Sequence, residues 1–155
     1  MKTIKALSLF TGAGGLDLGF EAAGFEVILA SDIMAESCAT LVFNRPDRPV
    51  FGPPKYTGNI LDLDAITVKR LTGLGPGDLD LMIGGPPCQP FSVAAAQRFL
   101  KGDAKFKRKG FDCEDKGQLI FHYVRLIVSL MPRVFIIENV PGILSIDGGE
   151  GIEVV

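Results

Sequence analysis

The chain has 155 residues, a net charge of −2 and a pI of about 5.4, a length that suits one domain with its own hydrophobic core. Hydrophobic residues make up 47% of the chain and glycine occurs 19 times, a composition that excludes a disordered or fibrous protein. This overall charge does not mark a nucleic-acid binder, so any attraction to phosphate must come from a local patch.

Strand and helix patterns alternate along the first half of the chain. Apolar runs predict two strands, and a helical pattern follows each of them, giving the segments 4–10, 16–23, 26–31 and 35–44 in order. A glycine-rich turn at Thr11–Gly15 joins the first strand to the first helix, and Gly24 ends that helix. Four prolines and a glycine between Arg45 and Pro54 predict a loop.

The same alternation continues in the second half. We expect a short third strand at 58–61, a helix at 65–71, a fourth strand at 80–84, a long mobile loop at 93–116, a helix at 118–131 and a fifth strand at 134–140. Strands that alternate with helices predict a parallel α/β sheet with right-handed crossovers. The nearly continuous apolar strands agree with a sheet that is covered on both faces.

Three cysteines, Cys38, Cys88 and Cys113, are widely spaced. There is no CxxC or Cys/His cluster, so the sequence predicts neither a zinc site nor a disulfide framework, and we expect no metal. An odd number of scattered thiols is typical of a reducing compartment. No stretch of the sequence approaches the length of a membrane span, so we expect no membrane partner.

The turn after the first strand predicts a cofactor site. Its glycines, Gly12, Gly14 and Gly15, allow backbone N–H groups and a helix N-terminus to approach a ligand closely. Asp32 ends the second strand, where a carboxylate can accept hydrogen bonds from ribose hydroxyls. These features indicate an adenosine-containing cofactor, but they fit NAD as well as S-adenosylmethionine, and the spacing also occurs in α/β proteins that bind no nucleotide.

A rigid turn around Cys88 predicts a nucleophile. The run Pro86-Pro87-Cys88-Gln89-Pro90 directly follows the fourth strand, at the sheet edge where α/β proteins bind ligands. Its prolines fix the backbone φ angles on both sides of the thiol. The plainer alternative, a buried structural cysteine, does not need such a turn.

Two further features belong with this turn. Glu138 ends the fifth strand at the same sheet edge, where partial burial would raise its pKa and let it deliver a proton; a turn-capping role is the alternative. The segment 97–111 carries six basic residues and one acidic residue, interleaved with phenylalanines. Such a patch can neutralise phosphates, although a solvated surface loop would look the same.

Together these residues resemble the motifs of the cytosine-C5 DNA methyltransferase family. Residues 10–15 match its glycine motif, 86–92 its catalytic motif and 138–140 its Glu-Asn-Val motif, in the family's order. Gly58-Asn59-Ile60 is similar to its short third-strand motif, and Gly110-Phe111 to the end of its mobile catalytic loop. The resemblance covers nearly the whole chain, and the Pro-Cys-Gln motif is highly specific.

The resemblance implies an α/β fold with the Rossmann-like, mostly parallel sheet of S-adenosylmethionine-dependent methyltransferases, incomplete at its C-terminal side. Residues 1–155 would form the cofactor-binding and catalytic domain, without the target-recognition region. The implied activity is methyl transfer from S-adenosylmethionine to C5 of a flipped cytosine in double-stranded DNA, through a covalent adduct with Cys88, as in restriction–modification. We then expect a cytoplasmic protein, associated with the nucleoid if it is bacterial.

The resemblance also assigns roles by position. Asp32 would hold the ribose, Ile33 would pack on adenine, and Asn59 would accept a hydrogen bond from the adenine amino group, where the family often has aspartate. Cys88 and Glu138 would be catalytic, with Glu138 at N3 of the cytosine. The full cofactor set is Phe10, Thr11, Gly12, Ala13, Gly14, Gly15, Asp32, Ile33, Asn59, Ile60 and Pro86. The substrate-binding set is Pro87, Gln89, Ser92, Asn139, Arg98, Lys105, Lys107 and Arg108.

Three alternatives stay open. An NAD-dependent oxidoreductase explains the segment from Gly12 to Asp32 but leaves the Pro-Pro-Cys-Gln turn unexplained. A truncated relative could act only as a binding partner, and some relatives with these motifs methylate tRNA. The family's later motifs, its recognition region and its returning C-terminal helix do not precede Val155. We therefore expect the chain alone to be incompetent, and a second chain or a C-terminal portion to complete the fold.

Overall fold

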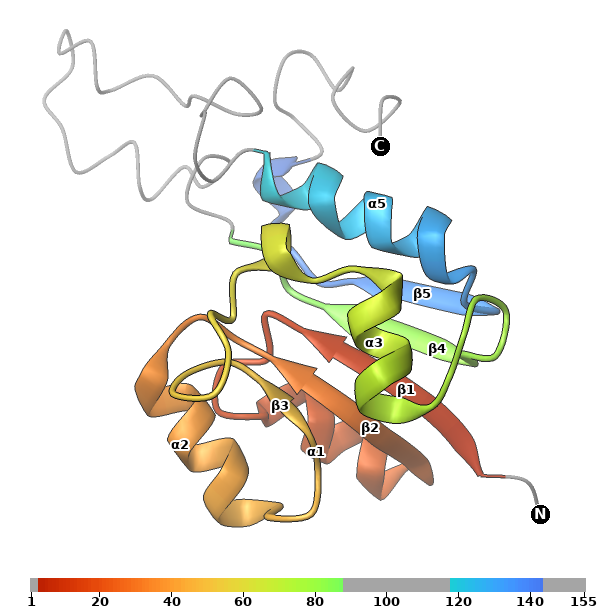
Figure 1. The fold of residues 1–155 in the computed structure, drawn as a ribbon. Coiled ribbons are helices and arrows are strands. Elements are labelled where there is room, and N and C mark those ends of the chain that lie inside the picture. The colour runs from red at the N-terminus through yellow and green to blue at the C-terminus, as the bar shows by residue number, and fades with distance from the viewer. Residues whose placement is uncertain (1–2, 88–117, 144–155) are drawn as a thin grey trace, which may run out of the picture.

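Helices lie on both faces of a five-stranded sheet in the computed structural model, which describes residues 3–87 and 118–143 (Figure 1). The strands are all parallel and stand in the order β3-β2-β1-β4-β5. They are β1 (Ile4–Leu9), β2 (Phe25–Ser31), β3 (Val50–Phe51), β4 (Leu81–Gly84) and β5 (Val134–Ile137). The helices are α1 (Gly15–Ala22), α2 (Ala35–Asn44), α3 (Ala65–Thr72), α5 (Leu119–Leu130) and the short 3₁₀ helix η1 (Ile60–Asp62). This order reverses direction between β1 and β4, and such a switch point is where open α/β sheets bind ligands.

The third strand is not where the sequence predicted it. The segment 58–61 is not a strand, because the Asn59 side chain accepts a hydrogen bond from the Leu61 N–H and starts η1 instead. The third strand, β3, lies in the segment 45–54 that was expected to be a loop. Only two residues long and at the sheet edge, it tolerates the prolines around it, since an edge strand can do without some N–H donors.

The fifth strand is also shorter than predicted. It ends at Ile137 rather than at Val140, and one more ladder bond follows, from the Glu138 N–H to the Gly84 carbonyl at 2.9 Å. Beyond it, the Asn139 side chain accepts from the Val140 N–H at 2.9 Å, a local bond that competes with continued strand pairing. The segment 93–116, predicted to be a mobile loop, lies outside the described residues.

A β-bulge in β2 sets which of its residues face which layer. Ala6 pairs with Val27, but the next residue of β1, Leu7, pairs with Leu29, so Ile28 has no counterpart. An extra residue reverses the alternation of side chains beyond it. Val27 therefore packs in the cluster on the α1 side, whereas Leu29 packs in the main core on the α3 and α5 side.

The main core lies between the sheet and the helices α3 and α5, and Tyr123 occupies its centre. Its side chain is fully buried, and its hydroxyl donates to the carbonyl oxygens of Met82 (3.2 Å) and Ile136 (2.9 Å). A Cβ on Gly84 would stand 2.7 Å from the Tyr123 ring, so this position needs glycine. Burial raises the pKa of Tyr123 above its ordinary value. One side chain of α5 thus joins β4 to β5.

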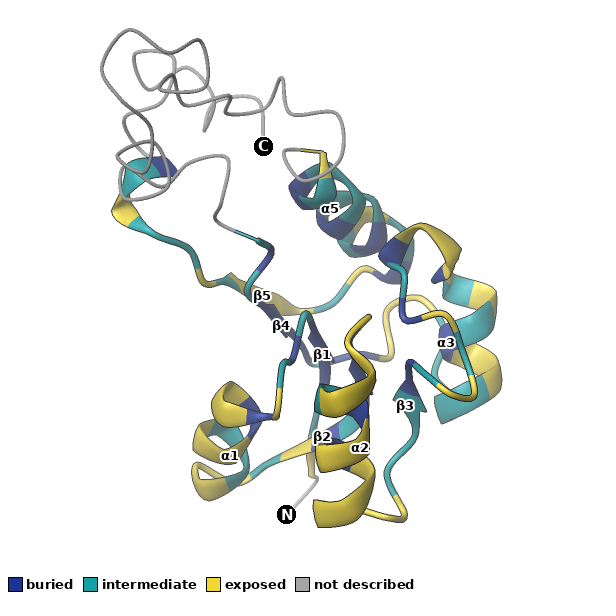
Figure 2. Ribbon diagram, turned by 90° about the vertical axis from the view of Figure 1, so that its left-hand side faces the viewer, coloured by how far each residue is buried: buried dark blue, intermediate teal, exposed yellow. Residues whose placement is uncertain are grey.

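β5 is the least covered strand. Val134 and Ile136 pair with Leu81 and Ile83, so they lie on the α1 side of the sheet, yet they are 54% and 39% exposed. Phe135, on the opposite face, is 51% exposed. Figure 2 shows β5 at the margin of the sheet with exposed residues. Within residues 3–87 and 118–143, β5 has a neighbouring strand on one side only, and apolar side chains on both faces of such an edge strand favour association.

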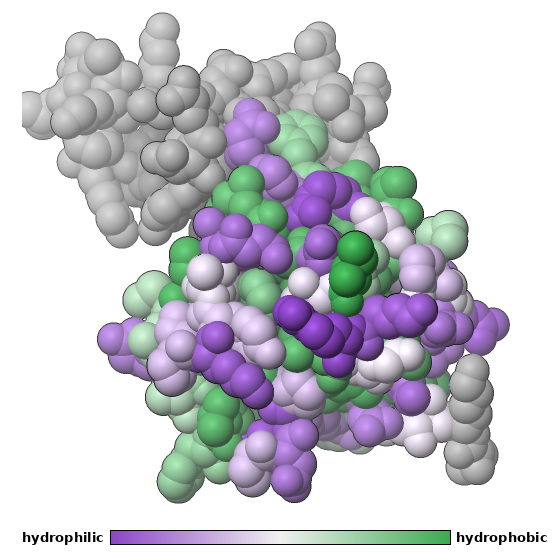
Figure 3. All heavy atoms as spheres, viewed as in Figure 1, coloured by the Kyte–Doolittle hydropathy of each residue, from purple (hydrophilic) through white to green (hydrophobic). Residues whose placement is uncertain are grey.

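The remaining surface is mixed. On the face shown in Figure 3, hydrophilic and hydrophobic residues are interspersed, as is usual for a folded domain. Within residues 3–87 and 118–143, none of the helices has the length and apolar character needed to cross a membrane.

We predict that Tyr123→Phe lowers the free energy of unfolding by about 1 kcal/mol, the usual net contribution of a buried hydrogen bond. Tyr56→Phe is the matched control, because the half-buried Tyr56 ring stacks on Phe51 at 5.2 Å, a contact that does not need the hydroxyl. Urea unfolding followed by circular dichroism measures both. Equal stabilities of the two variants would contradict the bridging role of Tyr123.

Candidate active site

A cavity of about 700 Å³ opens at the carboxyl ends of β1, β2 and β4. Its floor is the switch point of the sheet, and the loop before η1 and the first turn of α5 form its walls. The lining residues are Leu9, Phe10, Gly12, Ser31, Asp32, Ile33, Met34, Gly58, Asn59, Ile60, Leu61, Gly85, Pro87, Gln118, Leu119 and His122. Of the eleven predicted cofactor residues, it contains Phe10, Gly12, Asp32, Ile33, Asn59 and Ile60.

Asp32 links two elements at the cavity. Its carboxylate accepts from the Gly12 N–H at 2.7 Å and from the Met34 N–H at 2.8 Å, at the start of α2. An ionised carboxylate has about four acceptor sites, so roughly two remain for a ligand. Asp32 is half-buried and lines the cavity. It therefore fixes the glycine turn and also offers charge to the cavity.

The glycine turn has a backbone that few other residues could adopt. Gly12 and Gly14 have φ angles of 56° and 90°, and a Cβ on Gly12 would meet no atom within 4 Å, which leaves the space beside it open to the cavity. Phe10, at 53°, is one of the non-glycine residues with positive φ. Such strain tends to occur at functional sites.

Other residues of the turn support it rather than line the cavity. The Thr11 hydroxyl donates to the backbone at Ser8 and Ser31, at 3.1 and 3.2 Å, and Thr11 is buried. Ala13 and Gly14 lie on the other side of the turn, at a small cavity facing α2, where a Cβ on Gly14 would be 3.0 Å from Leu41. Thr11, Ala13, Gly14 and Gly15 are not among the cavity residues.

A buried carboxylate, Asp17, lies below the glycine turn. It accepts from the Ser8 hydroxyl at 2.6 Å, and Arg48 Nη1 lies 3.3 Å from its other oxygen. Burial raises the pKa of Asp17, while the Ser8 hydrogen bond and the Arg48 charge oppose that rise. The Ser8 hydroxyl oxygen also lies 3.2 Å from the Thr11 hydroxyl oxygen, so this network supports the turn from beneath.

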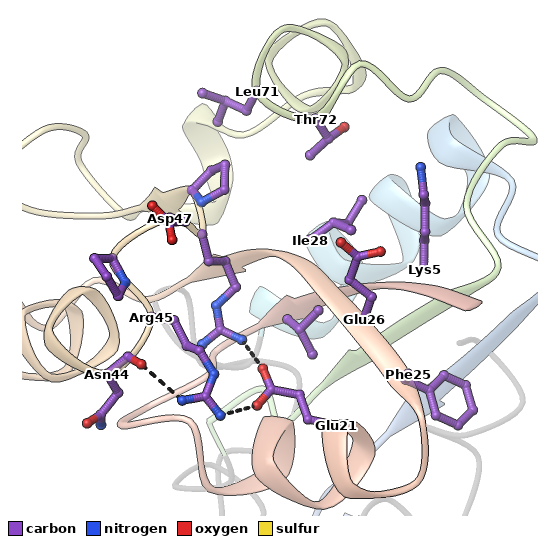
Figure 4. Close-up of a pocket in the computed structure, with 14 residues that line it drawn as sticks. Lys5, Glu21, Phe25, Glu26, Ile28, Asn44, Arg45, Asp47, Leu71 and Thr72 are labelled. Carbon is purple, nitrogen blue, oxygen red and sulfur yellow. Dashed lines mark hydrogen bonds and ion pairs between the residues drawn. The ribbon is translucent and has the colours of Figure 1, made fainter. Parts of the chain in front are cut away.

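A second cavity, of about 650 Å³, opens at the opposite, amino ends of β1 and β2. Figure 4 shows Arg45 pointing at Glu21 there, and the two form an ion pair of 2.6 Å. Arg48 also pairs with Glu21, at 2.9 Å. Glu21 is thus shared by both arginines, and Arg48 Nε has no hydrogen-bond partner among the described residues.

The loop before η1 is held in place from two directions. A Cβ on Gly58 would overlap the backbone of Asp32 and Ile33, so only glycine permits this close approach. Arg125 of α5 donates from Nη2 to the carbonyl oxygens of Ile60 (2.8 Å) and Leu63 (2.9 Å). Asn59 and Ile60 are thereby fixed at the cavity wall.

The sequence did not predict the contribution of α5. Gln118, Leu119 and His122, from its cap and first turn, line the cavity, and Arg125 acts one turn later. A sequence pattern could have indicated this contribution, because these residues recur at helical spacing after the basic segment. His122 is the single histidine of the chain.

Glu138 and Asn139 bring the end of β5 to the segment that leads into Cys88. Asn139 Nδ2 donates to the Pro86 carbonyl at 3.1 Å. The Glu138 carboxylate lies beside Gly85, where an added Cβ would be 3.0 Å from Oε2. Glu138 is exposed, so the partial burial expected for it was wrong. Pro87 lines the cavity, whereas Pro86 instead accepts the bond from Asn139.

Several predicted residues lie outside the part of the chain that the structure describes. They are Cys88, Gln89, Ser92, Arg98, Lys105, Lys107 and Arg108. Their predicted roles stay predictions, but the described residues on either side, up to Pro87 and from Gln118, both reach the cavity.

Two known proteins that are similar to this chain are both named as methyltransferases. The type II methyltransferase M.AquIA of Picosynechococcus is 36% identical over 151 residues, which are 97% of this chain and 54% of that protein. The DNA (cytosine-5-)-methyltransferase M.ApeKI of Aeropyrum pernix is 38% identical over 160 aligned residues, 100% of this chain and 32% of that protein.

A solved structure agrees. A prophage-encoded protein of E. coli, described as a DNA modification methyltransferase, superposes with a TM-score of 0.70 at 29% identity, over 97% of this chain and 36% of that one. The chain thus spans between 32% and 54% of the length of these relatives. The family model described as C-5 cytosine-specific DNA methylase matches residues 4–155. This match takes in nearly every residue, and the chain therefore belongs to the C-5 cytosine-specific DNA methylase family.

Proposed function

We propose that the protein containing this chain transfers a methyl group from S-adenosylmethionine to C5 of a flipped cytosine in double-stranded DNA. The observation that carries the proposal is the bond from Asn139 Nδ2 to the Pro86 carbonyl, at 3.1 Å. It joins the strand end that bears Glu138 to the turn that leads into Cys88. Pro87, the described residue before the predicted nucleophile, lines the cavity, and the predicted acid follows the neighbouring strand β5, which supports the proposal.

The cavity residues fit S-adenosylmethionine. Asp32 keeps acceptor capacity for ribose hydroxyls, and the open space at Gly12 admits a ligand close to the backbone. Ile33, Met34 and Leu61 line the cavity yet are 59%, 56% and 54% exposed, so a planar apolar base would cover surface that is otherwise in water. When bound, this cofactor supplies an electrophilic methyl group.

Cys88 and Glu138 account for the activation of the cytosine. Cytosine C5 is a poor nucleophile, and addition of the Cys88 thiolate at C6 converts the ring to an enamine-like species. Glu138 would hydrogen-bond or protonate N3 and stabilise the charge that develops. Once C5 has taken the methyl group, a base would remove the C5 proton as the Cys88 thiolate leaves, which would restore the aromatic ring. The ring is unreachable inside a duplex, so the cytosine must first be flipped out.

DNA is favoured over tRNA as the substrate. Two of the similar proteins, the DNA (cytosine-5-)-methyltransferase M.ApeKI and the E. coli DNA modification methyltransferase, have DNA in their names. The basic residues Arg98, Lys105, Lys107 and Arg108 would contact phosphates, which position the duplex without reading its sequence. A reducing, cytoplasmic setting suits a thiolate nucleophile.

We predict that Asp32→Ala weakens the binding of S-adenosylhomocysteine by roughly 1–3 kcal/mol, the cost of losing hydrogen bonds to a charged group. Because Asp32 also holds the glycine turn, its substitution can weaken binding indirectly. A second ligand that lacks one ribose hydroxyl separates this indirect effect from the loss of the direct hydrogen bond. The native protein should bind the 2′-deoxy analogue less tightly than the parent, and Asp32→Ala should bind the two alike. Titration calorimetry measures all four affinities. An equal penalty for the analogue in both proteins would place the ribose elsewhere.

We predict that Cys88→Ser abolishes the covalent complex with DNA that contains 5-fluorocytosine, while S-adenosylhomocysteine still binds. In that DNA the fluorine replaces the C5 proton whose loss releases the thiol, so the adduct accumulates. Denaturing gels detect the shifted band, and Cys113→Ser is the matched control. Adduct formation by Cys88→Ser would assign the nucleophile to another residue.

We propose that the exposed edge of β5 pairs with further polypeptide, either a C-terminal continuation or a second chain. Residues 1–155 alone should then show no methyl transfer to plasmid DNA, and an added C-terminal fragment of a longer relative should restore it. Phe135→Lys should weaken this complementation, because it places charge on the apolar edge. Ile66→Lys, on a side chain of α3 that is 78% exposed, should leave it intact. Sequence-specific turnover by residues 1–155 alone would refute the proposal.

A further inference from the structure

Asn59 lies in a hydrogen-bond network that fixes which end of its amide points where. Its Oδ1 accepts from the Leu61 N–H at 3.1 Å and caps η1. Its backbone N–H donates to the Thr57 hydroxyl at 3.2 Å, and that hydroxyl donates to Asp62 at 2.6 Å. A reversed amide would place the NH₂ group against the Leu61 N–H, donor against donor, so the oxygen must face Leu61.

The remaining end of the amide is a donor. Asn59 lines the cavity and is half-buried. Among the described residues, its Nδ2 has no hydrogen-bond partner. The apolar side chains of Ile33, Ile60 and Leu61 line the same cavity. A donor in such a place favours a ligand atom that accepts a hydrogen bond.

An asparagine that faces the cavity with its NH₂ group differs from a carboxylate, which could only accept a hydrogen bond there. An aspartate at this position could cap η1 with one oxygen and present the other, an acceptor, to the cavity. Such a site suits the 6-amino group of adenine. Asparagine keeps the cap but replaces the free oxygen by NH₂, so the amino group would meet a donor.

We infer that Asn59 donates from Nδ2 to a ring nitrogen of adenine beside the amino group, N1 or N7, and does not accept from the amino group. The inference rests on the proposed cofactor and differs from the expectation drawn from the resemblance, in which Asn59 accepts from the amino group. Adenine would be recognised through its acceptor, and the 6-amino group would contribute little to affinity.

Titration calorimetry on the full-length protein tests this with S-adenosylhomocysteine and three analogues: 1-deaza, 7-deaza and one lacking the 6-amino group. We expect one deaza analogue to bind about three- to tenfold more weakly than the parent, the range typical of one neutral hydrogen bond. That analogue also identifies the ring nitrogen. Loss of the 6-amino group should change the affinity by less than about twofold.

Asn59→Asp supplies the reciprocal measurement, because aspartate still caps η1. In this variant the loss of the amino group should weaken binding and the loss of the ring nitrogen should not. Asn44→Asp, the same chemical change at the second cavity, should keep the native preferences. If the native protein loses affinity when the amino group is removed but not when either ring nitrogen is replaced, the inference is overturned and the cofactor proposal stands. Failure of the native protein to bind the parent compound overturns the cofactor proposal, and the inference with it.

Discussion

The Asp32 carboxylate holds the site together. It accepts backbone N–H groups from the glycine turn after β1 and from the start of α2, at 2.7 and 2.8 Å. Gly12 and Asp32 are 20 residues apart in sequence, and they meet only because β1 and β2 are parallel neighbours. The remaining structure places this carboxylate: Gly58 lets the η1 loop lie against the Asp32 backbone, and the Cys38 thiol donates to its carbonyl at 3.2 Å. A side chain that binds a cofactor here would therefore be held rigid before the cofactor arrives.

Much of this arrangement could be predicted from the sequence, for a physical reason. The apolar runs of β1, β2 and β4 are buried and nearly continuous, and the glycines after β1 leave little doubt about the turn. Asp32 and Gly12 could be paired because consecutive parallel strands end at one sheet edge. The third strand could not be predicted, since two residues at an edge have no periodicity. The segment around Asn59 was predicted to be a strand but forms η1. The Asn59 side chain accepts the Leu61 N–H, which in a strand would bond to a neighbouring strand.

Long-range contacts explain the rest of what was missed. Arg125 appears in the sequence as one charged residue on a helix, yet it bonds carbonyl groups more than 60 positions earlier. Asn139 was predicted to contact the substrate, a role that stays a prediction, but the bond from its amide to the Pro86 carbonyl was not foreseen. Both residues form side-chain-to-backbone bonds, which depend on three-dimensional placement and leave no periodic pattern. The burial expected for Glu138 failed for a similar reason, since exposure depends on which other segments cover the end of β5.

The unpaired Ile28 in β2 sets which layer the side chains that follow it face. Side chains on a strand alternate, so the residues after the bulge have the opposite phase to those before it. Without the extra residue, Leu29 would leave the main core and Asp32 would point to the other layer. The side chains of β2 therefore alternate in one phase before the bulge, where they pack against α1, and in the opposite phase after it, where they face the cavity. This change of phase lets β2 pack against α1 at its start and contribute to the main core and the cavity at its end.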